Sequence, residues 1–398
     1  MTAYLDHAAT TPVLPEVIDV VARTMRDVGN ASSLHTAGRS ARRVVEESRE
    51  SIADDLGARP SEIVFTSGGT ESDNMAIKGS LWRQVAKDPR RRRLLISAIE
   101  HHAVLDPVEH LVTTGQADVT WLMPNGQGVI TGATLKSALD EDPDSAALVS
   151  VMWANNEVGT IQPIADLAAL AHEAGVPLHT DAVQTLGQVQ LQLSDTGADM
   201  VTLTGHKVGG PLGVGILVTG RDQDLVPLTH GGGQERQLRS GTLDVPGIAG
   251  LATAVRYAVG HQESEAVRLA GLRDGLIAGA RDLDPSITVS GFYEAGDTRR
   301  RLAGNAHLLV PDCDGDSLLY LLDAVGIECS TGSACQAGVP QPSHVLLAMG
   351  MSEATARGAL RLTLGHTSTA GDVEAFLAAL PAAIERARRA RHATSRAS

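Results

Sequence analysis

A lysine and an aspartate that end two successive apolar runs could together do covalent chemistry on a carbonyl compound. Asp181 ends the apolar part of VPLHTDAVQ (176–184), and Lys207 ends the later run LTGHK. Lysine forms a Schiff base with a carbonyl, and a buried carboxylate can pair with a pyridinium nitrogen. Taken singly, either residue is more often a solvated surface charge. Together they are the two partners that pyridoxal phosphate requires.

The segment TSGGTESDN (66–74) could hold the phosphate of such a cofactor. It lies between an apolar run and a helix-like sequence, so its backbone N–H groups fall at the positive end of a helix, where anions bind. Gly69 and Thr70 would supply N–H groups and a hydroxyl. An ordinary capped turn is the alternative, and no nucleotide-binding P-loop pattern occurs in the sequence.

His101, in EHHAVLD (100–106), is a candidate for ring stacking and proton transfer. A flat imidazole can lie on a cofactor ring and titrates near neutral pH. A metal site is disfavoured, because His101 and His102 would point to opposite faces of a strand and no zinc-ligand spacing accompanies them. A plain loop histidine is the alternative.

Cys335 is the candidate nucleophile among the three cysteines. It lies in CSTGSACQAG (329–338) between glycines and small residues, where an exposed thiolate could swing into a cleft. Cys313 and Cys329 adjoin apolar runs, which favours buried and inert thiols. A Cys329–Cys335 redox pair is the alternative.

Strand-like and helix-like segments alternate through the first 220 residues, as the positioning of these groups requires. Such alternation predicts a mostly parallel sheet, in which ligands bind at the carboxyl ends of the strands. The candidate groups fall at such ends. A strand, a glycine turn and a helix are expected in order over 62–77. Further strands are expected within 91–97, 146–156, 176–184, 198–207 and 213–218, and further helices over 36–56, from about 103, and over 163–175.

The pattern changes near residue 252, after which a smaller α+β domain is expected. We predict a large domain over 14–251 and a small domain formed by 1–13 and 252–398. Within the small domain, helices are expected over 268–283, 316–326 and 372–392 and from 343, and strands over 305–310 and 360–365.

Composition excludes several classes of function. The 398-residue chain is 43% apolar and carries 47 acidic against 33 basic residues, a net charge of −14, which disfavours a nucleic-acid or membrane-surface binder. No apolar run reaches the ~18 residues of a membrane span, and the first ten residues do not look like a signal peptide. An odd number of cysteines favours a reduced, cytoplasmic compartment.

Nine motifs in sequence order resemble the cysteine desulfurases of the NifS/IscS type, and above all the actinobacterial IscS-like members. These are fold-type I pyridoxal phosphate enzymes of the class V aminotransferase group. The motifs are YLDHAATTP (4–12), TSGGTESDN (66–74), EHHAV (100–104), NNEVG (155–159), DAVQ (181–184), TGHK (204–207), GGGQE with RSGT (231–242), STGSAC (330–335) and LRLTLG (360–365). The fold implied is a large domain with a mostly parallel seven-stranded sheet plus a smaller α+β domain.

The resemblance also implies a role for each matched residue. Lys207 would carry pyridoxal 5'-phosphate, and Cys335 would accept sulfur from L-cysteine as a persulfide and leave L-alanine. His101 would stack on the cofactor ring and transfer protons, Asp181 would bond the pyridine nitrogen, and Gln184 would bond the phenolic oxygen. The phosphate would be bound by Gly69, Thr70, Thr204 and His206. Asn156 would contact cofactor and substrate, and Arg361 would bind the substrate carboxylate.

The implied partners are a second copy of the chain and a sulfur acceptor. Thr242 resembles the residue that reaches the phosphate of the neighbouring subunit, so a homodimer is implied. The acceptor would be an iron–sulfur scaffold or a tRNA- or DNA-thiolating enzyme, with no direct contact to nucleic acid, no membrane and no metal. The alternatives are a selenocysteine lyase, another class V aminotransferase, or a non-catalytic sulfur-carrier scaffold.

Overall fold

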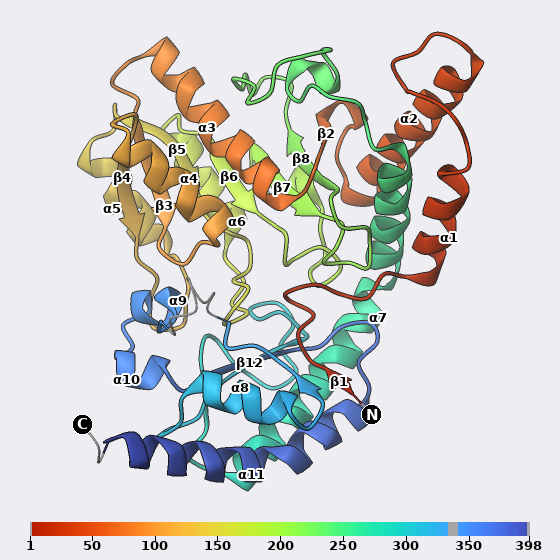
Figure 1. The fold of residues 1–398 in the computed structure, drawn as a ribbon. Helices are drawn as coiled ribbons and strands as arrows, with labels where there is room; N and C mark the ends of the chain where they lie inside the picture. Colours follow the sequence, from red (N-terminus) through yellow and green to blue (C-terminus); the bar gives the residue numbers. More distant parts are fainter. Residues whose placement is uncertain (1, 333–340, 396–398) are drawn as a thin grey trace.

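The computed structural model describes residues 2–332 and 341–395 (Figure 1). A seven-stranded sheet forms the centre of the larger part. In spatial order its strands are β2 (Ile63–Thr66), β8 (Gly215–Thr219), β7 (Met200–Thr204), β6 (Leu178–Asp181), β5 (Ala146–Ser150), β3 (Arg93–Ser97) and β4 (Asp118–Leu122). Neighbours from β7 to β4 run parallel, which confirms the predicted mostly parallel sheet.

One strand departs from the parallel arrangement. β8 runs antiparallel to both β7 and β2. Only residues 205–214 separate β7 from β8, too few for the helical crossover that a parallel pair needs. The Lys207 turn therefore links two antiparallel strands at the sheet edge where the parallel strands end.

Helices cover both faces of the sheet, and successive residues of a strand pack against opposite helical layers. Val64, Leu94 and Met200 pack with α3 (Gly69–Lys87) and α4 (His102–Thr113). The alternate positions Phe65 and Leu95 face the other layer. That layer contains α2 (Thr36–Leu56), α5 (Gly132–Glu141), α6 (Ile164–Glu173) and the first part of α7 (Val245–Leu283), with α1 (Pro15–Thr24) packed outside.

Helix α2 shows how local sequence sets these elements. The side chain of His35 accepts a hydrogen bond from Gly38 N at its start, and Gly57 ends it at φ +66 in the left-handed conformation that glycine adopts readily. Val45, Ile52 and Leu56 form its buried face. The predicted helix over 36–56 is thus confirmed.

The smaller part packs an antiparallel sheet against helices. Its strands are β9 (Thr288–Val289), β10 (Asn305–Leu309) and β12 (Ala359–Thr363), and β1 (Ala3–Tyr4) pairs separately with β11 (Ile327–Glu328). The helices are α8 (Gly315–Asp323), α9 (His344–Ala348), α10 (Glu353–Ala356) and α11 (Ala370–Ser395). Three single 3-10 turns complete the described elements: Pro60–Glu62, Leu193–Asp195 and Glu235–Gln237.

Helix α7 is continuous across the boundary proposed at residue 251 (Figure 1). Its residues Ile248 and Leu251 belong to the core around the large sheet, whereas Leu269 and Leu276 belong to the core of the smaller part. We therefore keep two domains as a proposal, joined through one shared helix. None of the described helices is both long and apolar enough to cross a membrane.

Candidate active site

The polar ends of the strands meet at one edge of the large sheet, where the N-terminal segment crosses over them. Asp181 is the last residue of β6, and Thr204 is the last of β7. His101 follows β3 as the N-terminal cap of α4, where its ring accepts a hydrogen bond from Ala103 N at 3.1 Å. Chain topology thus gathers groups that are far apart in sequence, as parallel sheets do at their carboxyl edge.

Lys207 ends on backbone carbonyls of the N-terminal segment. Its Nζ donates to Ala8 O and, at 2.7 Å, to Ala9 O. Burial lowers the pKa of Lys207 to about 8, and the positive charge of Arg361 acts in the same direction. A substantial fraction of this amine is therefore unprotonated near neutral pH, as imine formation requires.

Asp181 is a buried carboxyl group beside that amine. Its Oδ1 accepts a hydrogen bond from Val183 N at 2.8 Å. Burial raises the pKa of Asp181 to about 6, while the Val183 N–H and the Lys207 charge oppose the rise. Asp73 and Glu100 are fully buried nearby, and burial together with the Asp181 charge raises the pKa of both. A cation held against Asp181 would relieve this crowding of acids.

The turn before α3 forms a cradle of closely packed backbone. Gly68 has φ +148, and a Cβ atom on Gly215 would lie 2.6 Å from the Gly68 Cα, so neither position accommodates a side chain easily. Gly69 begins α3, where the first N–H groups have no partner within the helix. Thr204 lies beside this turn. This geometry suits the oxygens of a phosphate.

A loop far along the chain is tied to the same cradle. Glu71, in the first turn of α3, accepts hydrogen bonds from Ser67 N at 2.6 Å and from Arg239 Nε at 2.9 Å. Thr242 lies just beyond Arg239 and is exposed. The ion pair thus ties the loop that precedes Thr242 to the first turn of α3.

Two imidazoles near the amine are kept neutral. Burial, and to a lesser extent the Lys207 charge, lower the pKa of His206 to about 4. Desolvation and then the same charge lower the pKa of His101 to about 4. His206 Nδ1 lies 3.3 Å from the hydroxyl of Thr10. Both rings are therefore uncharged at neutral pH, and each has a ring nitrogen that can accept a hydrogen bond.

Arg361 and Asn156 are brought together from distant parts of the chain. Arg361 extends from β12, and its Nη1 donates to the backbone carbonyl of Asn156 at 3.1 Å. Its Nη2 lies 2.7 Å from Oδ1 of Asp6. A guanidinium in this place offers a planar fork for a carboxylate.

The N-terminal segment connects these groups. Gln184 Nε2 donates to Ala8 O at 3.0 Å, sharing that carbonyl with Lys207. Behind it, His7 Nδ1 lies 2.5 Å from the hydroxyl of Thr11, and Ala8 N donates to the hydroxyl of Thr363 at 2.8 Å. The floor of the site is therefore built from the first eleven residues on a strand of the small domain.

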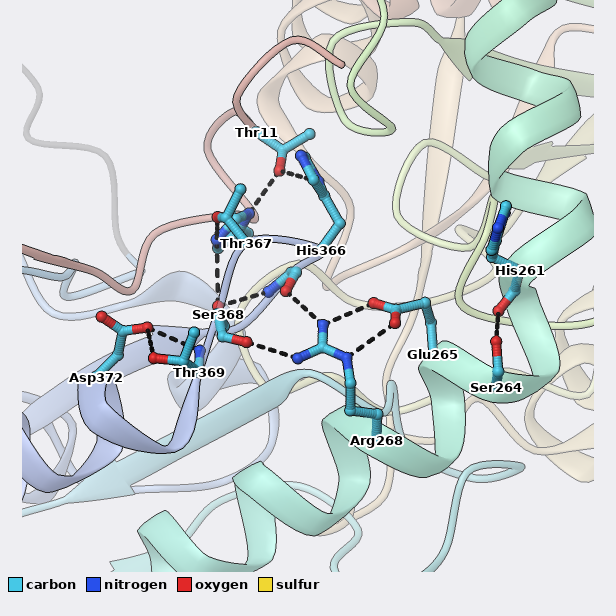
Figure 2. Close-up of polar contacts among 12 residues, drawn as sticks. Thr11, His261, Ser264, Glu265, Arg268, His366, Thr367, Ser368, Thr369 and Asp372 are labelled. Carbon is cyan, nitrogen blue, oxygen red and sulfur yellow. Dashed lines mark hydrogen bonds and ion pairs between the residues drawn. The ribbon is translucent and has the colours of Figure 1, made fainter. Parts of the chain in front are cut away.

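A polar network supports the segment from behind (Figure 2). Thr11 faces His366, at 3.5 Å between hydroxyl and ring nitrogen, and Arg268 of α7 donates to the carbonyl of Ser368 at 2.5 Å. Arg268 is itself held by both carboxylate oxygens of Glu265. These bonds fix the turn after β12 against α7 and so steady the strand that carries Arg361.

Of the two cysteines that the structure describes, Cys313 is buried as expected, whereas Cys329 is only partly buried. Cys313 is fully buried, and burial raises the pKa of its thiol. Burial raises the pKa of Cys329 to about 12, which makes it a poor nucleophile at neutral pH. Cys335 lies outside the described residues. Among the described residues no group of three metal-ligating side chains occurs.

The sequence did not predict the parts of the site that consist of backbone atoms or of contacts between distant residues. The acceptors for Lys207 are backbone carbonyls of Ala8 and Ala9, which any residue could supply. The pairs of Asp6 with Arg361 and of Glu71 with Arg239 join distant parts of the chain, so spacing does not reveal them. The motif YLDHAATTP could have drawn attention to Asp6, since it sets an acid among small residues.

Comparison with known proteins places this geometry in a family. The family model for aminotransferase class-V matches residues 3–376. The chain belongs to the class V aminotransferase family. It is 55% identical to the IscS-like cysteine desulfurase of Mycobacterium tuberculosis over 396 residues, which covers 100% of both chains. It is 41% identical to the cysteine desulfurase IscS of Dictyoglomus turgidum, covering 97% of this chain and 95% of the relative.

A solved structure also shows the same fold. A NifS-like protein superposes with a TM-score of 0.87 at 34% identity, covering 97% of this chain and 100% of its own. The family match and the fold bear out the predicted fold-type I architecture and its cofactor, pyridoxal phosphate. The described residues fit that group: a glycine-lined cradle for the phosphate, a buried acid for the ring nitrogen and an amine of lowered pKa for the aldehyde.

Proposed function

We propose that this protein is a pyridoxal phosphate-dependent cysteine desulfurase, which removes sulfur from L-cysteine and releases L-alanine. The observation that carries the proposal is the Lys207 amine, its pKa lowered to about 8, between Asp181 and Arg361 at the carboxyl edge of the sheet. The full-length similarity to curated cysteine desulfurases supports the choice among reactions of the family.

When bound, pyridoxal phosphate supplies an electron sink for the carbon next to the amino group. Lys207 would hold the cofactor through its amine, and the same amine would serve as the base for the proton on the substrate Cα. Asp181, as an anion, keeps the pyridine nitrogen positive. Gln184 would bond the phenolic oxygen, while Gly69, Thr70, Thr204 and His206 bind the phosphate.

The substrate is oriented by two groups and attacked by a third. Arg361 would bind its carboxylate with Asn156 beside it, while His101 would stack on the cofactor ring and transfer protons. The thiolate of Cys335 attacks the substrate sulfur, so that an S–S bond forms as the C–S bond breaks. The electron pair stays on the carbon and is protonated to give L-alanine, leaving a persulfide on Cys335.

The wider assembly is also proposed. Thr242, exposed next to the cradle, would reach the phosphate of a second subunit in a homodimer. The persulfide would pass to an acceptor protein, either an iron–sulfur scaffold or a thiolation enzyme. We infer a cytoplasmic location, in which thiols stay reduced.

Substitution of the nucleophile tests the function. Cys335→Ser should keep the absorbance of the bound cofactor but lose sulfide release from L-cysteine in the presence of a reductant. Cys329→Ser is the matched control and should retain sulfide release, because its thiol is partly buried and has a raised pKa. Sulfide production that survives Cys335→Ser would refute the persulfide role, and amino-group transfer without sulfide would favour an aminotransferase.

A further inference from the structure

Arg361, the proposed anchor for the substrate carboxylate, is already paired with an acid of the same chain. Asp6 Oδ1 lies 2.7 Å from Arg361 Nη2. The Arg361 side chain is 7% exposed and that of Asp6 is 22% exposed. The pair therefore lies in the wall of the cleft, with the acid on its more open side.

Asp6 occupies only part of the guanidinium. Nη1 donates to the carbonyl of Asn156, and Nε is buried without a hydrogen-bond partner among the residues that the structure describes. The contact with Asp6 is a single hydrogen bond. A free carboxylate can take two parallel N–H groups of an arginine, which is the stronger arrangement. A substrate carboxylate can therefore displace the Asp6 side chain.

The backbone at Asp6 does not depend on this ion pair. Leu5 O accepts a hydrogen bond from Thr363 N at 2.7 Å, and His7 N donates to Thr363 O at 3.3 Å. The Tyr4 hydroxyl donates to the carbonyl of Asp6 at 3.1 Å. The side chain can rotate toward solvent while the segment that supports Lys207 stays in place.

Two carboxylates at one guanidinium would repel each other. We propose that Asp6 is an internal substitute for the substrate carboxylate: it holds Arg361 in position in the free enzyme and is displaced when an amino acid binds. This inference rests on the proposed function, because it takes Arg361 as the carboxylate site. Asp6 thereby lowers the affinity for amino acids and speeds the release of L-alanine.

The test measures binding of the product L-alanine, which lacks sulfur and is not turned over to sulfide. The absorbance of the bound cofactor reports binding to the loaded enzyme. Asp6→Asn, close in shape but uncharged, should lower the Kd of L-alanine about fivefold, the size of a partly exposed ion pair. The Kd of L-alaninamide, which has no carboxylate, should not change.

A double-mutant cycle shows whether Asp6 acts through Arg361. Arg361→Lys should raise the Kd of L-alanine about tenfold or more, because lysine lacks the fork. Adding Asp6→Asn to Arg361→Lys should then give no tightening. The proposal fails if Asp6→Asn weakens L-alanine binding, or tightens L-alaninamide equally.

The proposed function fails in a different way. If Arg361→Lys leaves the Kd of L-alanine unchanged, the carboxylate site lies elsewhere, and the role of Asp6 fails with it. If only the Asp6→Asn result is absent, the carboxylate site stands and Asp6 is a structural partner alone. Asp6→Ala repeats the comparison without the amide, which could itself bond Arg361.

Discussion

The lowered pKa of Lys207 predicts that cofactor uptake by the empty protein is fast near neutral pH. Imine formation needs the unprotonated amine. With a pKa of about 8, about one lysine in ten is unprotonated at pH 7, whereas at the ordinary 10.5 only about three in ten thousand would be. Lys207 should therefore present about 300 times more reactive amine than an exposed lysine at this pH.

The assay follows the imine absorbance after the empty protein is mixed with pyridoxal phosphate between pH 6 and 10. Dividing each rate by that of a free lysine derivative, itself corrected for the ionisation of its own amine, removes the ionisation of the cofactor. The rate for the protein should rise with pH and level off above about 8. Arg361→Gln should move this midpoint upward, because the Arg361 charge helps to lower the pKa of Lys207.

The reasoning is refuted if the rate for the protein still rises tenfold per pH unit through pH 9.5. That result would mean that Lys207 titrates as a solvated amine, and that neither burial nor the Arg361 charge acts on it. An unchanged midpoint in Arg361→Gln would contradict the electrostatic part alone and leave burial as the cause.

Two substitutions outside the reacting groups test the packing that supports them. Glu235 is buried, and both of its carboxylate oxygens accept hydrogen bonds from Arg49, at 2.7 and 2.9 Å. Because Glu235→Ala leaves the Arg49 charge without this partner, it should destabilise the fold by about 3–5 kcal/mol. An unchanged denaturation midpoint would contradict this prediction. A Cβ atom at Gly365 would overlap the His7 imidazole, so Gly365→Ala should cost about 1–3 kcal/mol in thermal unfolding. His7→Ala added to Gly365→Ala should recover part of that loss, and an equally unstable double variant would count against the clash.

The sequence predicted the elements whose signals are local. The helix over 36–56 and the strands that end at Asp181 and Thr204 each combine apolar periodicity with a clear stop, such as Gly57. It did not predict the antiparallel β8, because strand direction depends on the connection as well as on composition. Nor did it show that α7 starts at Val245 and runs on into the small domain.

The sequence predicted the side chains of the candidate site but not the N-terminal backbone that forms its floor. Lys207, Asp181 and His101 stand at strand ends or just beyond them, and a parallel sheet brings such ends together. The N-terminal carbonyls that hold Lys207 depend on contacts with residue 363, which no local pattern encodes. The buried acids Asp73 and Glu100 were also missed, since a lone acid in a sequence looks like a surface charge.

The contacts between the N-terminal segment and Thr363 determine when the surroundings of Lys207 can be completed during synthesis. Residues 5–8 are hydrogen-bonded to Thr363, near the other end of the chain. During synthesis residues 5–8 leave the ribosome long before their partner strand β12 is translated. A growing chain can form the large sheet early, but its lysine gains its final neighbours only after translation has passed residue 363.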